Sequence, residues 1–255
     1  MCYDIHTTLK TQLKRAKRYT PELVPEIEEK LIPYQEQIKL EWYHASGFAH
    51  PFVLIYTNEA PFEPVPAQWG LIPHWSKDME SAKKFWNNTL NARGETLFEK
   101  PSFRDAAKHK RCLVYVDGFF EHHHKNQQTY PYYFYRKDGE PMILAGIWSE
   151  WIDKTSGEIL KTFSILTKRG NDTFAEIHNN PKLNEPRMPL ILDESSTELW
   201  LNTNKKIDEM NHLFVPQPHP EIEYHTVRKL RGKEAIGDIP EAIEPYVYDE
   251  LNTLF

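Results

Sequence analysis

Short apolar runs, several of them alternating with polar residues, dominate the middle of the chain. Five such runs, separated by short turns, lie at 111–117, 118–123, 130–136, 142–151 and 159–167. Strands this closely spaced favour a meandering sheet or a barrel over a fold in which strands and helices alternate. Further strands are predicted at 37–44, 51–57, 187–192 and 221–227.

Helices are expected around these strands. Helical segments are predicted at 7–18, from 101 onwards, at 172–177, 194–202 and 205–214. The helix beginning at 101 would hold Pro101 in its first turn, where the missing N–H of proline costs nothing. Residues 19–31 contain two prolines and are expected to form an irregular connector with a helical turn or two, and the proline-rich stretch 58–68 is expected to form a loop. The last residues, from 240 on, read as a tail packed on the surface.

The pattern as a whole predicts one α+β domain spanning residues 1–255. Its centre would be a barrel-like, mainly antiparallel β core with peripheral helices. Residues 193–255 would add helices, a strand and the tail to this core. We find no internal repeat and no clear linker in the sequence.

Composition narrows the functional classes. No apolar stretch approaches the roughly 20 residues that span a bilayer, and the start carries an acid rather than a signal peptide, so a cytoplasmic protein without membrane contact is expected. Only two cysteines occur, which excludes a disulfide framework. The net charge of −6 argues against non-specific coating of nucleic acid. The basic run 100–111 is either a solvated helix face or part of a local groove.

The second residue is a cysteine, in the opening MCYDIH. If Met1 is removed, Cys2 carries a free α-amine and a thiol on adjacent carbons. With pKa values of about 7.7–8.0 and 8.5, the pair is nucleophilic near neutral pH. An aldehyde would form a Schiff base with the amine, and the thiol would close it to a five-membered thiazolidine. Peptide hydrolysis by an N-terminal nucleophile is the alternative.

Two further residues could move protons. Glu121 lies in the apolar run DGFFEHHH and either faces solvent or is buried with a raised pKa, suited to general acid–base work. His178, in AEIHNN, is a second proton carrier or a cap. Three consecutive histidines follow Glu121, but neighbouring strand residues point to opposite faces, so no metal and no cofactor is expected. Cys112 reads as a core cysteine.

The segments WGLIPHW (69–75) and NNTLNARGET (87–96) could contact nucleic acid. Trp69 and Trp75 are either core residues or stacking platforms for the bases of a single strand. Arg93 and Arg104 could hold phosphates with their planar guanidinium groups.

Taken in order, these motifs resemble the SOS response-associated peptidase (SRAP) family, which includes abasic-site processing proteins. The resemblance rests on MC, WGLIPHW, NARGET, PSFR, RCLV followed by GFFE, ILAGIW, TFSILT, IH and RMPLIL. They cover roughly residues 1–5 and 69–192. The resemblance implies a compact α+β fold around a barrel-like core. It also implies that single-stranded DNA with an abasic site is captured covalently by the N-terminal cysteine, by a protein that we expect to be a monomer.

The resemblance also implies residue roles. Cys2 would be the nucleophile and Asn91 would orient it. Glu121 would move protons, and His178 would assist opening of the sugar ring. The residues expected to contact DNA, by stacking or through phosphates, are Trp69, Gly70, Leu71, Trp75, Arg93, Arg104 and Arg187.

The chain departs from the family pattern in several places. Asp4 stands where a basic residue is common, Tyr115 replaces a proline, and His122 replaces an aromatic. An insertion, NNPKLNEP (179–186), separates His178 from Arg187. Three hypotheses follow: covalent capture of abasic sites, a cysteine peptidase, or a non-catalytic reader of modified or single-stranded DNA.

Overall fold

A closed ring of five strands forms the centre of the computed structural model, which describes residues 2–154 and 156–252. Its strands are β3 (Phe52–Thr57), β4 (Val65–Trp69), β6 (Arg111–Val116), β9 (Met142–Ile152) and β10 (Ile159–Arg169). The order round the ring is β10, β4, β3, β6, β9, and β9 pairs back with β10. Every pairing is antiparallel except β10 with β4. The predicted barrel-like, mainly antiparallel core is confirmed.

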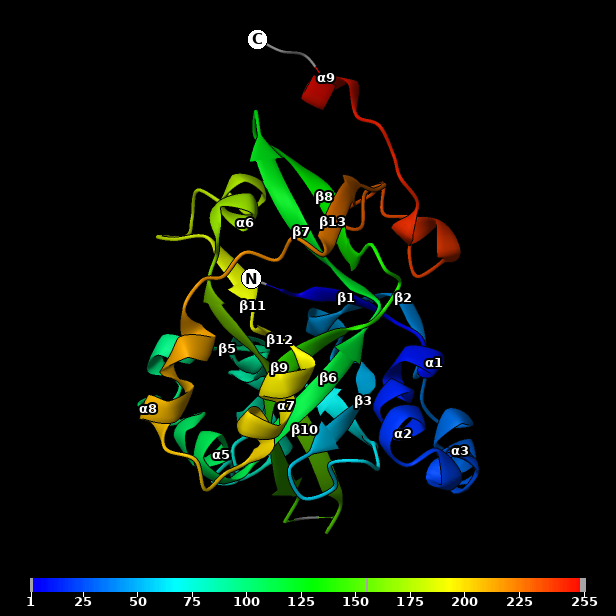
Figure 1. The fold of residues 1–255 in the computed structure, drawn as a ribbon, viewed down its shortest axis with the longest axis vertical. Coiled ribbons are helices and arrows are strands. Elements are labelled where there is room, and N and C mark those ends of the chain that lie inside the picture. The colour runs from blue at the N-terminus through cyan, green and yellow to red at the C-terminus, as the bar shows by residue number, and fades with distance from the viewer. Residues whose placement is uncertain (1, 155, 253–255) are drawn as a thin grey trace.

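A second, five-stranded antiparallel sheet lies above the barrel in Figure 1. Its order is β13 (Ile222–Thr226), β8 (Gln128–Arg136), β7 (Gly118–Lys125), β1 (Asp4–Thr7) and β2 (Trp42–Ser46). The strand β1 therefore lies inside this sheet, between β7 and β2, in the middle of the molecule. Three short strands extend the barrel: β5 (Asn91–Arg93) and β11 (Arg187–Pro189) pair with β10, and β12 (Ile191–Leu192) pairs with β9.

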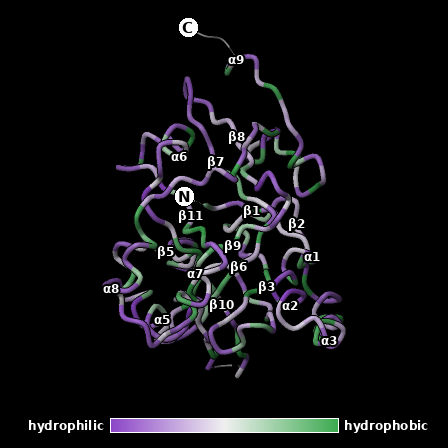
Figure 2. Tube along the Cα trace, in the orientation of Figure 1, coloured by the Kyte–Doolittle hydropathy of each residue, from purple (hydrophilic) through white to green (hydrophobic). Residues whose placement is uncertain are grey.

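Both faces of the barrel strands are buried. Along β3, Val53 and Ile55 belong to one apolar cluster, together with Trp69 and Cys2, while Leu54 and Tyr56 belong to a second cluster that includes helical residues. Two covered faces explain why β6 is a continuous apolar run rather than an alternating one. Figure 2 shows hydrophobic residues along the barrel strands and hydrophilic ones toward the periphery.

Helices surround the barrel and the upper sheet. The α-helices are α1 (Leu9–Gln12), α2 (Lys14–Tyr19), α3 (Val24–Gln35), α4 (Met79–Lys83), α5 (Arg104–His109), α6 (Asp172–Ile177), α7 (Glu194–Leu201), α8 (Ile207–Met210) and α9 (Asp249–Asn252). The 3-10 turns are η1 (Pro21–Leu23), η2 (Gly47–Ala49), η3 (Trp86–Thr89), η4 (Gly94–Thr96), η5 (Asn211–Phe214) and η6 (Pro240–Ile243). Within the described residues, no helix has the length and apolar character needed to cross a membrane.

Several predicted elements were wrong. Residues 19–31 do not form an irregular connector, because Pro25 lies in the first turn of α3, where its missing N–H is harmless. The predicted helix 7–18 begins two residues later and is broken at Leu13, which has φ −90° and ψ 0°. The loop 58–68 ends early, since β4 starts at Val65.

Other boundaries shift by a few residues. The strand predicted at 37–44 forms only from Trp42, and α5 begins at Arg104, so Pro101 precedes the helix instead of lying in its first turn. The segment 187–192 is two short strands, and 205–214 is a short α-helix followed by a 3-10 turn.

Candidate active site

Cys2 lies in the core, and hydrogen bonds hold the backbone carbonyl groups of Cys2 and of the next residue, Tyr3. The Cys2 side chain has no exposed surface. The Asn91 side chain donates a hydrogen bond from Nδ2 to the Cys2 carbonyl oxygen at 2.8 Å, and the Gly47 amide donates to the Tyr3 carbonyl at 2.7 Å. Asp4 then begins β1, paired with both neighbouring strands. These contacts fix the cysteine before the sheet begins. Met1, on whose removal the expected aminothiol depends, lies outside the described residues.

Trp69 helps to position Asn91 by binding the backbone of the preceding residue, Leu90. Its indole Nε1 donates to the Leu90 carbonyl at 2.8 Å, and Asn91 then pairs with Ile165 of β10. The ring has no exposed surface and belongs to the barrel core. The expectation that Trp69 stacks on DNA was therefore wrong, because a base cannot reach a ring enclosed by the barrel. Its contribution to the site is structural.

Glu121 and His178 form a buried acid–imidazole pair. Glu121 comes from β7 and His178 directly follows α6, and the Glu121 Oε2 and His178 Nδ1 atoms lie 4.0 Å apart. The side chains are each only 4% exposed. The Nδ1 atom also lies 2.7 Å from the Arg187 carbonyl oxygen, which fixes the orientation of the ring. The structure thus brings together both residues that the sequence proposed as proton carriers.

The pKa of the Cys2 thiol depends on its burial and on the charge of Glu121. Burial raises the pKa of the Cys2 thiol well above its usual value, and the charge of Glu121 raises it further. The thiol is therefore protonated at neutral pH. A reaction through sulfur at this site needs a base to remove the thiol proton. The charges of two carboxylates, Glu121 and Asp4, reach the thiol, and that of Glu121 has the larger effect.

Two pockets open on either side of Tyr3. One, of about 280 Å³, is lined by Tyr3, Asp4, Glu121, His122, His124, Thr129, His178, Asn180, Leu183 and Arg231. We call it the acid pocket, because it contains Glu121. The other, of about 380 Å³, includes Tyr3, Asn91, Arg93 and Lys100, and we call it the basic pocket. Tyr3 is common to both, so the pockets meet beside the cysteine.

A third hollow continues from the basic pocket. It has a volume of about 260 Å³, is mostly apolar, and shares Pro101 and Ser102 with the basic pocket. Trp75 lines it, with 48% of its surface exposed. The ring packs against Phe85 with centroids 5.7 Å apart. Of the two tryptophans in WGLIPHW, Trp75 is the one available for stacking.

The remaining predicted DNA contacts divide into accessible and inaccessible residues. Arg93 is exposed at the end of β5 and lines the basic pocket. Arg104 is exposed on α5, with its Nε atom 4.0 Å from Asp105 Oδ1. It lines neither of the two pockets that share Tyr3. Gly70 and Leu71 are both buried. Gly70 lines none of these three hollows, so its predicted DNA contact was wrong, whereas Leu71 lines the hollow that contains Trp75 and its contact stays a prediction.

Arg187 also differs from the prediction. It has no exposed surface, and its guanidinium group contacts both carboxylate oxygens of Glu95 at 2.8 Å and Glu185 at 2.9 Å. The predicted phosphate contact was wrong, because the donors are already engaged with carboxylates inside the protein. Arg187 instead supports His178, since the Arg187 backbone contacts the imidazole.

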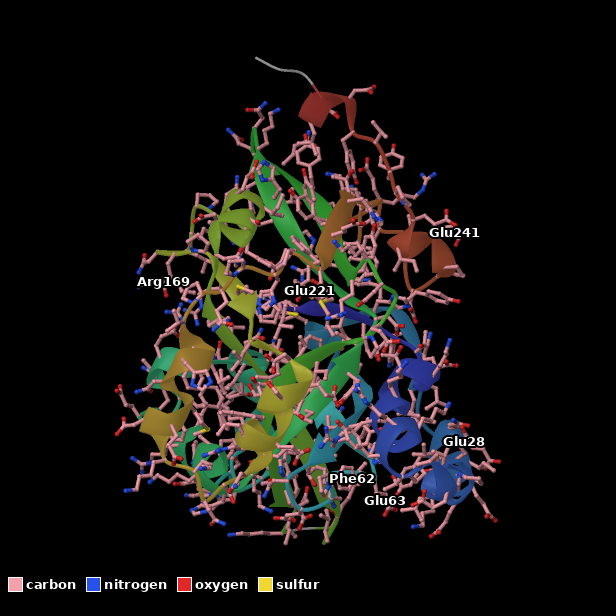
Figure 3. All side chains as sticks on the ribbon, in the orientation of Figure 1. Glu28, Phe62, Glu63, Arg169, Glu221 and Glu241 are labelled. Atoms are coloured by element: carbon pink, nitrogen blue, oxygen red, sulfur yellow. The ribbon has the colours of Figure 1, made fainter. Side chains whose placement is uncertain are left out.

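The insertion 179–186 forms a wall of the acid pocket. Asn179 pairs with the backbone of His124, at 2.6 Å to its amide and 2.9 Å to its carbonyl oxygen, while Asn180 and Leu183 line the pocket. At the other end of the insertion, Glu185 accepts a hydrogen bond from Arg169 Nε at 2.8 Å. Arg169 lies near the edge of the molecule in Figure 3. The resemblance gave no role to this segment.

The histidine run contributes to the same pocket. His122 and His124 line it together with Glu121, while His123 packs against Tyr132. Burial lowers the pKa of His122 to about 4, so this ring is neutral at physiological pH. Among the described residues, no cluster of three or more histidine, cysteine, aspartate or glutamate side chains is arranged to hold a metal ion.

Sequence reasoning missed several lining residues. Tyr3 was overlooked although it adjoins Cys2, and Lys100 was noted only as part of a basic run. Arg231 lies in a region that matches the family motifs loosely, and its one signal was the basic stretch VRKLR at 227–231.

The fold and the site define a class: a five-stranded barrel protein with a core cysteine at position 2, held by an asparagine beside a buried glutamate–histidine pair. Comparison with known proteins agrees. The chain belongs to the SOS response associated peptidase (SRAP) family, whose family model matches residues 4–233.

Relatives and solved structures extend this assignment. The abasic site processing protein YoqW of Bacillus subtilis is 33% identical over 181 residues, covering 70% of this chain and 75% of the relative. The abasic site processing protein YMR114C of Saccharomyces cerevisiae is 35% identical over 172 residues, covering 65% of this chain and 43% of the relative. A crystal structure of a Bacteroides thetaiotaomicron protein superposes with a TM-score of 0.79 at 33% identity, covering 96% of this chain and all of that one.

Proposed function

We propose that this protein recognises abasic sites in single-stranded DNA and captures them covalently through Cys2 after removal of Met1. The observation that carries the proposal is the placement of Cys2, held by Asn91 and lying within the electrostatic reach of Glu121. The names of the relatives, abasic site processing proteins, support the choice of substrate.

The chemistry proceeds through an aldehyde. An abasic sugar opens to an aldehyde, and His178, at the wall of the acid pocket, can exchange the proton that ring opening requires. The α-amine of Cys2 adds to the aldehyde carbon and water leaves, which gives a Schiff base. The thiol then adds across the C=N bond, with its proton taken by Glu121 and a proton returned to nitrogen. The product is a thiazolidine, formed with net loss of one water.

The raised pKa of Cys2 sets the order of these steps. A thiol that is protonated at neutral pH is a poor first nucleophile, while α-amines in general have pKa values of about 7.7–8.0 and are partly neutral at that pH. The amine therefore attacks first and the sulfur closes the ring second. Glu121 acts in the second step, because that step must release the thiol proton.

The three connected hollows offer a path for the strand. From Trp75 the path runs past Pro101 and Ser102 to Arg93 and Lys100, then across Tyr3 into the acid pocket. An exposed aromatic ring with neighbouring cations is a suitable platform for a single strand, because every base has a face to stack and every nucleotide has a phosphate.

The experiment that tests the proposal is intact-mass spectrometry after incubation with an oligonucleotide carrying one abasic site. A Met-free protein should gain the mass of the oligonucleotide less one water. Cys2→Ala should form no adduct, and Cys2→Ser at most a hydrolysable Schiff base. Cys112→Ala is the matched control, because it removes the other buried cysteine and should crosslink like the wild type.

Two results would overturn the proposal. A Met-free wild-type protein that gains no mass would exclude covalent capture, and a stable adduct on Cys2→Ala would exclude the aminothiol mechanism. Peptide turnover that depends on Cys2 and Glu121, without DNA adducts, would favour a peptidase instead.

A further inference from the structure

Arg231 reaches the acid pocket from a segment that the family motifs barely cover. It lies more than 100 residues after Glu121, yet both line the same pocket. The segment is anchored by Val227 and Leu230, which are buried against Phe120 and Tyr133 of the five-stranded sheet. These anchors fix the backbone immediately before Arg231, so the position of Arg231 is set by the fold.

The Arg231 guanidinium group is held by a buried carboxylate. Its Nη2 donates to Asp4 Oδ2, and its Cζ lies 5.4 Å from the centre of the Phe48 ring. Asp4 is only 1% exposed, and its second oxygen lies 2.9 Å from His44 Nε2. Burial alone would raise the pKa of Asp4, but the hydrogen bond with His44 and the charge of Arg231 together lower it. Asp4 is therefore an ionised anchor.

The arginine keeps donors for a ligand. A guanidinium group carries five N–H donors in a rigid plane, and the bond to Asp4 uses one side of it. The Arg231 side chain remains 45% exposed. Among the described residues that line the acid pocket, Arg231 is the one lysine or arginine. Arg93 and Lys100 lie across Tyr3 in the basic pocket. Each of the two pockets, which share Tyr3, thus presents at least one cation.

We propose that Arg231 binds a phosphodiester of the DNA strand in the acid pocket, separate from the phosphate that Arg93 would bind in the basic pocket, and that Asp4 positions Arg231. The inference rests on the proposed function, because it places the captured sugar beside Cys2. It identifies the ligand as a backbone phosphate rather than a base, since a planar fork with free N–H groups matches phosphate oxygens.

The salt dependence of binding tests this contact. Each phosphate contact on a single strand contributes about 0.7 to the slope of log K against log salt. A Cys2→Ala protein, which cannot crosslink, is titrated with an oligonucleotide carrying one tetrahydrofuran abasic analogue. Adding Arg231→Gln should reduce the slope by about 0.7 and weaken binding about tenfold. Lys233→Gln is the matched control, because it removes one exposed charge from the same segment, outside the pocket lining.

A second pair of variants removes the risk of misfolding. Arg231→Gln alone leaves Asp4 with fewer partners, so the slope is also compared between Asp4→Asn and the double variant Asp4→Asn/Arg231→Gln. In that pair the buried position is neutral in both proteins. A difference of about 0.7 supports the contact. Equal slopes in either comparison, with folded proteins, would overturn it.

The two proposals fail separately. If the Cys2→Ala protein binds with an Arg231-dependent slope while the wild type forms no adduct, covalent capture is wrong and the phosphate contact stands. If adducts form but Arg231→Gln leaves the slope unchanged, the contact is wrong and capture stands. If the tetrahydrofuran strand does not bind at all, the contact is overturned.

Discussion

Replacing Arg187 with methionine separates a structural role from a phosphate-binding one. The guanidinium group has no exposed surface and makes two contacts of 2.8 Å to Glu95, one of 2.9 Å to Glu185 and one of 2.8 Å to the Thr167 carbonyl. Methionine fills much of the same volume but makes none of these bonds. We therefore expect Arg187→Met to lower the free energy of unfolding.

The magnitude follows from the burial of each partner. Removing one member of a fully buried ion pair costs about 3–5 kcal/mol. The Glu95 side chain is 40% exposed, so water can compensate part of this loss. The Thr167 carbonyl loses a donor, which adds about 1 kcal/mol. We expect a net loss of about 2–4 kcal/mol, which for a chain of this size lowers Tm by roughly 5–15 °C.

The pH dependence gives an independent check. Burial would raise the pKa of Glu95, but its hydrogen bond to Arg187 outweighs this and lowers it. A carboxylate whose pKa is lower in the folded state stabilises the fold above its ordinary value of 4.5, and loses that contribution as the pH falls through the lowered pKa. Arg187→Met should therefore lose part of the acid sensitivity of the wild type.

Urea unfolding followed by circular dichroism measures the change, and Arg93→Met is the matched control. Arg93 is exposed in the basic pocket, so its loss should leave stability unchanged and weaken DNA binding. The reasoning would be refuted by an Arg187→Met protein with wild-type stability and a reduced salt slope of DNA binding. That result would mean that Arg187 binds phosphate after all.

Three further substitutions test other parts of the structure. Gly70→Ala should lower the free energy of unfolding, measured in urea, by about 3 kcal/mol, because Gly70 has φ +114° and a Cβ would lie 2.5 Å from Trp86 Nε1. A loss below about 1 kcal/mol would contradict this. Burial lowers the pKa of Lys168 to about 8, below its unfolded value of 10.5, so its charge destabilises the fold below pH 8. The stability of wild type relative to Lys168→Met should therefore rise by up to about 3 kcal/mol between pH 7 and pH 10.5, and a flat difference would refute this. Trp75→Ala should weaken single-strand binding by about 1–3 kcal/mol in fluorescence anisotropy without changing the salt slope; unchanged affinity would show that the ring does not stack.

The sequence predicted the barrel because its strands are short, apolar and closely spaced. It could not predict the helix over 24–35, where Pro25 suggests a break. The same residue is harmless in the first turn of a helix, and only the packing of Val24, Ile27 and Leu31 shows that a helix forms. Local composition is ambiguous when tertiary contacts decide the outcome.

The sequence could predict those site residues whose expected role does not depend on whether the side chain is exposed. Cys2, Asn91, Glu121 and His178 are brought together as the ordered motifs implied. Trp69 and Arg187 were misassigned because the residue type alone does not show whether a tryptophan or an arginine faces solvent or the core. Burial separates the two tryptophans, because Trp69 ends β4 inside the barrel core, whereas Trp75 lies in the turn that follows this strand.

The place of β1 within its sheet has a consequence for biosynthesis. The strand docks between β2 and β7, and β7 spans Gly118–Lys125, so its second partner is synthesised more than 100 residues after Cys2. At about 5–20 residues per second, the nascent chain keeps its first residues undocked for roughly 6–25 seconds. Once β1 is in place, Cys2 is buried and Asn91 binds its carbonyl. The removal of Met1 that the proposed function requires would therefore have its opportunity on the ribosome, before β1 docks.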